Sequence, residues 1–251
     1  MFFLSVWVWV IFLEILKGLE IHGNALFLKR ESVLILSDLH IGFDASLNAN
    51  GILIPRFQYS DLFSELQRLL RELKPKLVVL NGDIKHEFSG ILREEGKFVL
   101  EFLDFINKRC ELVIVKGNHD SILKPLVDKL NLELRDYFVI GDFFICHGDR
   151  LFDNDDFKSC KFVIIGHEHP AVSLRSGVRV EKYRCFLHGS FQGKKLIVMP
   201  AMNPSSEGSD VLVERLLSPF LKNNSSFWDF KVFVVESGES YDFGVLRNLK
   251  S

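Results

Sequence analysis

Five short polar stretches of this chain each follow an apolar run, and each carries aspartate, asparagine or histidine. They are Ser37–His40, Asn81–Asp83, Gly117–Asp120, Cys146–Asp149 and Gly166–His169. Six of the eight histidines lie in or beside them. Parallel strands end at one edge of a sheet, where the loops gather side chains from distant parts of a chain. The pattern therefore predicts an α/β fold with a metal-binding active site at one sheet edge.

The apolar runs before these stretches predict strands that are buried on both faces, because they are short and bounded by glycine or polar residues. They lie at 33–36, 77–80, 112–115, 143–146 and 162–165. Between them, apolar residues recur at helical spacing over 57–73, 98–106 and 125–130. Alternating strands and helices indicate parallel strands joined by crossovers.

The pattern changes after residue 169, where strand-like segments lie at 178–180, 196–198 and 230–236. We therefore expect two packed sheets with helices outside them. The length of 251 residues and the hydrophobic content of 47% suit one large α/β domain, which we place at 14–251.

Residues 1–13 form an apolar N-terminal extension. A helix needs about 20 residues to span a bilayer, and a signal peptide has a basic start and a cleavage site, so stable membrane insertion is not expected. A surface anchor, an added strand or helix and an over-long start remain as interpretations, of which we favour the last two. Exposure of this segment would also leave a homodimer or a membrane contact open.

The balance of charge excludes a strong overall attraction to nucleic acid. The formal net charge is −2, with 31 basic and 33 acidic residues, so any site for a polyanion must be local. The four cysteines, Cys110, Cys146, Cys160 and Cys185, contain no C-x-x-C pair. Reduced cysteines in a cytoplasmic protein are the simplest interpretation, with Cys146 buried at the end of its apolar run.

The spacing of the polar side chains indicates metal binding. Asp38 and His40 are two residues apart, as are His167 and His169, and alternate residues of an extended segment point the same way. Asp83 follows a glycine, which lets the backbone turn beneath a bulky ligand. Carboxylates, imidazoles and one amide, without a thiolate, suit Mn²⁺, Fe or Zn²⁺ better than Ca²⁺ or a structural zinc site.

The motifs D-x-H, G-D, G-N-H-D, H-G and G-H-x-H, in this order over 38–169, resemble those of the calcineurin-like metallophosphoesterases. The resemblance implies a four-layer α/β/β/α sandwich with two divalent metal ions, for which we expect Mn²⁺ ahead of Fe or Zn²⁺. It implies that one ion is held by Asp38, His40 and His169. It implies that the other is held by Asn118, His147 and His167, with Asp83 bridging the two.

The resemblance also implies two catalytic residues beside the ions. His119 matches the family's non-ligand histidine, which contacts phosphate and can protonate the leaving oxygen, and Asp120 matches the acid that orients it. Two divalent ions carry a charge of about +4, from which Asp38, Asp83 and a bridging hydroxide subtract about three. A site that stays positive would attract a phosphate anion and stabilise the charge of in-line attack.

His86 departs from the commonest pattern, because many relatives carry Asp or Asn three residues after the aspartate that Asp83 matches. The Asp-Arg-Gly of the protein Ser/Thr phosphatases is also missing here. The form G-D-x-x-H resembles the repair-nuclease branch, which includes SbcD-like and DNA-ligase-associated metallophosphoesterases and in which this histidine faces the scissile phosphate. The proline-containing stretch Pro200–Pro204 is similar to that branch as well. The alternative for His86 is a solvated loop residue.

This resemblance favours a nuclease-like phosphodiesterase of the DNA-repair type, whose substrate is DNA or RNA. Between 171 and 195, six basic residues stand against one acid, which would suit a nucleic-acid backbone, although the solvated face of a β ribbon is slightly favoured. The alternative function is a nucleotide or cyclic-nucleotide phosphodiesterase or a phosphomonoesterase. A metal-free adaptor is a third, and the retained histidines argue against it.

Overall fold

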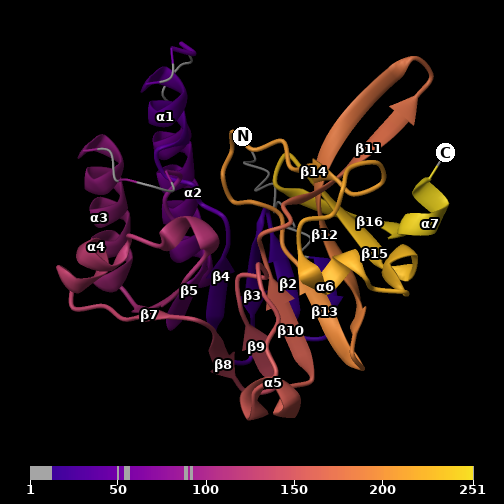
Figure 1. Cartoon of the computed structure of the whole chain (residues 1–251), viewed down its shortest axis with the longest axis horizontal. Coiled ribbons are helices and arrows are strands. Elements are labelled where there is room, and N and C mark those ends of the chain that lie inside the picture. Colours follow the sequence, from indigo (N-terminus) through magenta and orange to yellow (C-terminus); the bar gives the residue numbers. More distant parts are fainter. Residues whose placement is uncertain (1–12, 50, 54–56, 88–89, 91–92, 251) are drawn as a thin grey trace, which may run out of the picture.

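The computed structural model describes residues 13–49, 51–53, 57–87, 90 and 93–250 (Figure 1). The expected apolar extension at 1–13 lies outside the described residues except for Leu13, which begins the first strand. In the described ranges, no helix is long and apolar enough to cross a membrane.

The first sheet has seven strands in the order β1-β2-β3-β4-β5-β6-β7. Their bounds are β1 Leu13–Leu16, β2 Leu19–His22, β3 Ala25–Leu28, β4 Val33–Leu36, β5 Leu77–Asn81, β6 Glu111–Val115 and β7 Leu134–Arg135. Strands β1 to β4 are antiparallel neighbours, whereas β4 to β7 run parallel. The parallel half contains the strands predicted at 33–36, 77–80 and 112–115.

The second sheet follows the order β14-β11-β12-β13-β10-β9-β8, with β15 paired to β12 and β16 paired to β15. The bounds are β8 Phe138–Ile140, β9 Phe143–Ile145, β10 Phe162–Ile165, β11 Pro170–Ser176, β12 Arg179–Phe191, β13 Lys194–Val198, β14 Ser209–Asp210, β15 Lys231–Glu236 and β16 Glu239–Val245. Strands β9, β10 and β13 are parallel, so this sheet also has a parallel centre.

The helices are α1 Phe43–Ala49, α2 Gln58–Leu73, α3 Arg93–Asn107, η1 Asn118–Asp120, α4 Lys124–Asp128, α5 Asp155–Ser159, α6 Pro219–Lys222, η2 Phe227–Asp229 and α7 Leu246–Leu249. Helix α2 ends where the sequence predicts, because Lys74 takes a left-handed φ of 46° directly before Pro75. Helix α3 begins earlier than expected, at Arg93.

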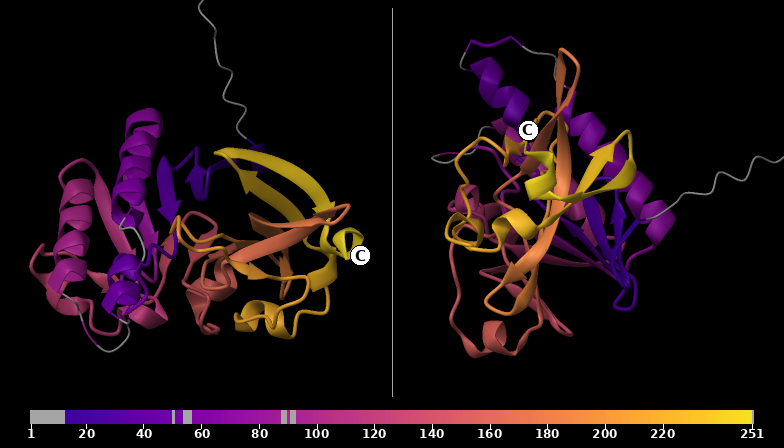
Figure 2. Two further views of the ribbon diagram at one scale, coloured as in Figure 1. Left: turned by 90° about the horizontal axis from the view of Figure 1, so that it is seen from above. Right: turned by 90° about the vertical axis from the view of Figure 1, so that its right-hand side faces the viewer.

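Three clusters of buried apolar side chains fill the spaces between the layers of the fold. Ile35 and Val79 of the first sheet share the inner cluster with Phe186 and Ile197 of the second sheet. Helices α2 and α3 cover the outer face of the first sheet, and α5 and α6 pack on the outer face of the second. The left view of Figure 2 shows α2 and α3 beside the first sheet, on the side away from the second. The expected α/β/β/α sandwich is therefore confirmed.

Strand β12 corrects one expectation. The sequence predicts that Val178 lies in a strand, but it lies in the turn between β11 and β12 and is fully exposed. The turn forms because Gly177 takes a positive φ of 63°. The β11–β12 hairpin projects beyond the rest of its sheet (Figure 1).

Candidate metal centre

All five polar stretches leave the sheets at one edge, at the ends of β4, β5, β6, β9 and β10. Hydrogen bonds tie their loops together: the amide of Asp38 donates to the carbonyl oxygen of Gly82 at 3.1 Å. Across the two sheets, the amide of His167 donates to the Asp38 carboxylate at 3.1 Å. The amide of Met202 donates to the Ser37 carbonyl oxygen at 2.9 Å, so the late proline-containing loop borders the same place.

Asp38, His40 and His169 form the first group of side chains that could hold a metal ion. One ligand atom of each lies within 4.8 Å of the others. Nε2 of His169 lies 3.0 Å from Oδ1 of Asp38 and 3.4 Å from Nε2 of His40. The Asp38 carboxylate is fully buried, so a cation is the natural partner for its charge.

Asp83, His147 and His167 form the second group, again within 4.8 Å of one another. Nε2 of His147 lies 3.3 Å from Oδ2 of Asp83 and 3.1 Å from Oδ1 of Asn118. Nδ1 of His147 lies 3.2 Å from the Asn81 carbonyl oxygen and can donate to it. That donation would leave Nε2 of His147 as the metal-binding nitrogen.

Asp83, a member of the second group, also faces the first. Its Oδ2 atom is 3.8 Å from Nε2 of His40, in the first group, and 3.3 Å from Nε2 of His147, in the second. Its Oδ1 atom accepts a hydrogen bond from the amide of His119 at 2.9 Å. The carboxylate can therefore face both groups at once, as a bridging ligand must.

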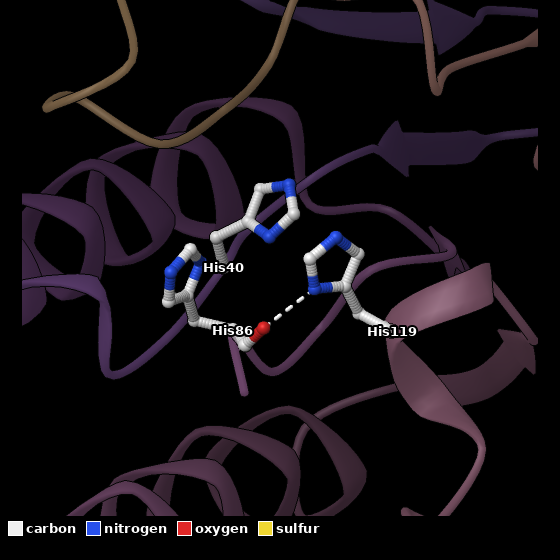
Figure 3. A group of neighbouring side chains, drawn as sticks. All are labelled: His40, His86 and His119. Atoms are coloured by element: carbon white, nitrogen blue, oxygen red, sulfur yellow. Dashed lines mark hydrogen bonds between the residues drawn. The ribbon is translucent and has the colours of Figure 1, made fainter. Parts of the chain in front are cut away.

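His86 and His119 stand beside His40 (Figure 3), and one nitrogen of each ring lies within 4.8 Å of the others. The ring centroid of His40 lies 4.8 Å from that of His119 and 5.5 Å from that of His86. Nδ1 of His119 is hydrogen bonded to the carbonyl oxygen of His86, and the His86 ring packs edge-on against Phe43. Thus His86 is partly buried at the site.

The side chain of Asp120 is hydrogen bonded to the backbone of the site. Its carboxylate accepts hydrogen bonds from the amides of Ile84 and Gly117, both at 3.0 Å. It therefore joins the loop that carries Asp83 to the loop that carries His119. Burial and the nearby Asp83 carboxylate raise the pKa of Asp120 to about 6.

The backbone at the proposed ligands is left-handed. Among the residues that the structure describes, ten non-glycine residues have a positive φ, and five of these are Asp38, His40, Asp83, His167 and His169. The expectation of extended segments at 38–40 and 167–169 is therefore wrong, because the side chains converge through tight turns. Such conformations cost about 1–3 kcal/mol each and persist where the surroundings hold them, often at functional sites.

Two glycines make room for the converging side chains. A Cβ atom at Gly82 would lie 2.3 Å from Nδ1 of His147. A Cβ atom at Gly166 would lie 1.9 Å from Oγ of Ser37 and 2.3 Å from Oδ2 of Asp38. No larger residue fits at either position without displacing a proposed ligand or its neighbour.

The calcineurin-like phosphoesterase family matches residues 32–225, which include all five polar stretches. The chain belongs to this family. A comparison with curated proteins finds no match.

A solved structure shares the fold of this chain. The chain superposes on the nuclease MPE of Pseudomonas putida with a TM-score of 0.62 and 18% identity, covering 90% of this chain and 94% of that one. It also matches YfcE, a phosphoesterase from E. coli, with a TM-score of 0.38 and 14% identity, covering 85% and 98% of the two chains. The first match shows a shared fold; the second carries no argument of its own.

The donor set of this phosphoesterase fits divalent metal ions. Burial and His169 lower the pKa of His40 to about 3, and burial and His147 lower the pKa of His167 to about 4. Both imidazoles are therefore neutral at pH 7, the form that binds metals. Burial disfavours charge on His147, yet the hydrogen bond and charge of Asp83, together with the charge of Asp38 and the Asn81 carbonyl, outweigh burial and raise its pKa to about 10. A divalent ion would replace the proton that His147 shares with Asp83.

Sequence reasoning missed several residues that support the site. Nε2 of Gln58, at the start of α2, donates to the His40 carbonyl oxygen at 2.6 Å. Oε1 of Glu95, which is fully buried in the first turn of α3, accepts hydrogen bonds from the amides of His86 at 2.9 Å and Glu87 at 3.0 Å. These residues lie outside every motif, so only the folded chain reveals them.

Proposed function

We propose that this chain is a dinuclear phosphoesterase that hydrolyses phosphodiester bonds, with nucleic acid as its substrate. In this proposal Asp38, His40 and His169 hold one ion. Asn118, His147 and His167 hold the other, and Asp83 bridges them. The single observation that carries the proposal is that Asp83 of the second, largely buried donor group also faces the first, beside two further histidines.

Two divalent ions, when bound, supply Lewis-acid activation of water and of the phosphoryl group. The protein contributes a placed proton. If Nδ1 of His119 donates to the His86 carbonyl oxygen, Nε2 remains as the atom that can pass a proton to the leaving oxygen. His86, half-buried beside it, is suited to contact the phosphate that is cleaved. Asp120 is a positioning residue, since it joins the backbones of their loops.

Nucleic acid is the substrate that we favour, because the protein of Pseudomonas putida with which this chain shares its fold is described as a nuclease. We expect Mn²⁺ as the metal, with Fe or Zn²⁺ as alternatives, because the mixed donor set accepts all three. The homodimer and the cytoplasmic location remain predictions.

A small phosphate ester is the second candidate, and the basic residues of the β11–β12 region favour it. Nζ of Lys182 lies 3.2 Å from Glu214, and the Arg184 guanidinium donates to the Asn203 carbonyl oxygen at 3.2 Å. These two cations are engaged within the chain, so this ribbon is a weaker guide for a nucleic-acid backbone. A nucleotide, a cyclic nucleotide or a phosphomonoester would not need such a guide.

A panel of substrates in Mn²⁺ tests the proposal. It compares a chromogenic phosphodiester with the matching monoester, then single-stranded DNA, double-stranded DNA and RNA with cyclic nucleotides. We expect cleavage of the diester and of at least one nucleic acid, and loss of both in Asp83→Ala. His188→Ala is the matched control, because His188 lies in β12, outside the donor groups. Hydrolysis of monoesters alone would exclude the proposed substrate class.

A further inference from the structure

Ser218 lies far along the chain from the five motifs, yet it holds two of the proposed ligand loops. It is fully buried directly before α6. Its Oγ atom donates to the carbonyl oxygen of Gly148, the residue after His147, at 2.7 Å. Its amide donates to Oε2 of Glu168 at 2.7 Å. One residue therefore connects the His147 loop to the turn that carries His167 and His169.

Glu168 supplies the other half of this connection. It stands between His167 and His169, and its side chain is fully buried. Besides the amide of Ser218, its carboxylate accepts a hydrogen bond from the amide of Leu217 at 2.9 Å. A buried carboxylate with two backbone donors has a defined orientation, so the backbone between the two histidines is fixed as well.

The hydrophobic core holds helix α6, which directly follows Ser218. Phe220 and Leu221, in α6, are 0% and 1% exposed and belong to the outer cluster of the second sheet. The ring of Phe220 lies 4.9 Å from that of Phe191, measured between centroids. Because α6 is held by this packing, Ser218 forms a fixed point against which the two loops are aligned.

We infer that Glu168 and Ser218 are positioning residues that set the spacing of His147, His167 and His169 for metal binding. This inference rests on the proposed function. Both His167 and His169 have a left-handed backbone, with φ values of 64° and 48°, so their turn needs support from outside itself. Partners that orient metal ligands change metal affinity or activity by about 10–100-fold when they are removed.

The test is Mn²⁺ affinity, measured by calorimetry on the full chain after the metal has been stripped with a chelator. We expect Ser218→Ala and Glu168→Ala each to weaken Mn²⁺ binding by about 10–100-fold. Glu168→Gln should recover most of the affinity, because its amide oxygen can accept from both backbone donors. The matched control is Glu214→Ala, which removes a carboxylate from the segment that carries Ser218, one that accepts from the amide of Asp210 at 2.9 Å.

Melting curves in chelator separate positioning from folding. The variants must melt cooperatively in the absence of metal, and Ser218→Ala removes only one hydroxyl, so it serves where Glu168→Ala does not fold. Mn²⁺ affinity of Ser218→Ala equal to that of Glu214→Ala, or an unchanged affinity in folded Glu168→Ala, would overturn the inference. An unaltered chain that binds no Mn²⁺ would instead overturn the proposed function. If the unaltered chain binds Mn²⁺ and cleaves the diester, and the Ser218→Ala and Glu168→Ala variants do both equally well, only the positioning role is refuted.

Discussion

Nδ1 of His119 is hydrogen bonded to the backbone carbonyl oxygen of His86, and the two imidazole rings lie 5.8 Å apart between their centroids. With Nδ1 as the donor, Nε2 of His119 faces the centre, 3.8 Å from Oδ2 of Asp83. The backbone of one histidine thereby sets the tautomer of the other. When the ring is protonated, its second proton lies on Nε2, so the general acid that we propose would present this proton in one direction.

His119→Gln tests this role. We expect kcat for a phosphodiester to fall by about 10²–10⁴-fold, the usual contribution of a general acid. Mn²⁺ affinity should stay near that of the unaltered chain, because His119 is not among the proposed ligands. Steady-state kinetics and calorimetry on the same preparation measure both, with His188→Ala as the control. A large loss of Mn²⁺ affinity would show that His119 is a ligand instead.

Glu95→Ala tests whether the His86 loop must be held. Its carboxylate accepts from the amides of His86 and Glu87, and the side chain packs on Gly42, where a Cβ would lie 2.8 Å from Cγ of Glu95. Removing the Glu95 carboxylate should lower activity about 10–100-fold and stability by about 1–3 kcal/mol. The partly buried Glu87 amide loses this acceptor, and the His86 amide keeps only the Ile41 carbonyl oxygen at 3.1 Å. Glu95→Gln keeps an acceptor and should retain most of the activity and the stability. Steady-state kinetics measure the activity and urea unfolding measures the stability. Equal losses in Glu95→Ala and Glu95→Gln would contradict the role of Glu95 as the acceptor that holds the His86 loop.

The convergence of the donor groups could be predicted from the sequence, but the backbone conformation of the residues that carry them could not. Short apolar runs followed by polar residues place Asp38, Asp83 and His147 at strand ends, because parallel strands end at a common edge. The spacing predicts extended segments at 38–40 and 167–169, whereas the structure has left-handed turns at both places. Spacing alone cannot separate the two, since both bring residues i and i+2 near one ion.

The supporting residues could not be predicted, because nothing in their local sequence marks them. Glu95 resembles any acid in the first turn of a helix, where it suits the helix dipole. Ser218 resembles an ordinary helix cap before proline. Their partners, His86 and Gly148, are fixed only by tertiary folding. In the same way, the apolar runs predicted the parallel strands, whereas strands β1 to β3 were not foreseen.

Gly82→Ala tests the close packing at the centre. A Cβ there would lie 2.3 Å from Nδ1 of His147, so we expect the ring to move and Mn²⁺ affinity to fall by at least about 10-fold. Gly193→Ala is a matched control, because its φ of 76° is close to the 82° of Gly82 and nothing lies within 4 Å of the added Cβ. Backbone strain is therefore similar in the two variants. If calorimetry finds the same affinity for both, packing against His147 is unimportant.

Metal ions should stabilise the fold, because they offset the repulsion between buried Asp38 and Asp83 and hold the left-handed turns. At free Mn²⁺ of about 100 times Kd, the free energy of unfolding should rise by about 2.7 kcal/mol. Melting curves with and without chelator measure the change. Asp83→Asn should show little or none of it, whereas a gain as large as that of the unaltered chain would argue against the bridging position.

His22 should make the fold less stable in mild acid. Its side chain is 1% exposed in β2, with Nε2 3.2 Å from Oε2 of Glu20. Burial lowers its pKa from 6.5, although Glu20 opposes the shift. The unfolded chain therefore binds a proton more readily than the folded chain. The stability that neutral His22 contributes is complete above pH 6.5 and is lost as pH falls through the lower pKa of the folded state.

His22→Gln removes this titration, so unfolding in chelator at about pH 8 and about pH 5.5 should show a smaller loss of stability in the variant than in the unaltered chain. Glu20 does not disturb the comparison, because burial raises its pKa but Lys29 and His22 outweigh burial and leave it below 4.5. The histidines of the metal centre titrate in both proteins, and their effect cancels in the difference. Equal losses over this pH range would show that His22 is protonated as easily in the folded chain as in the unfolded one.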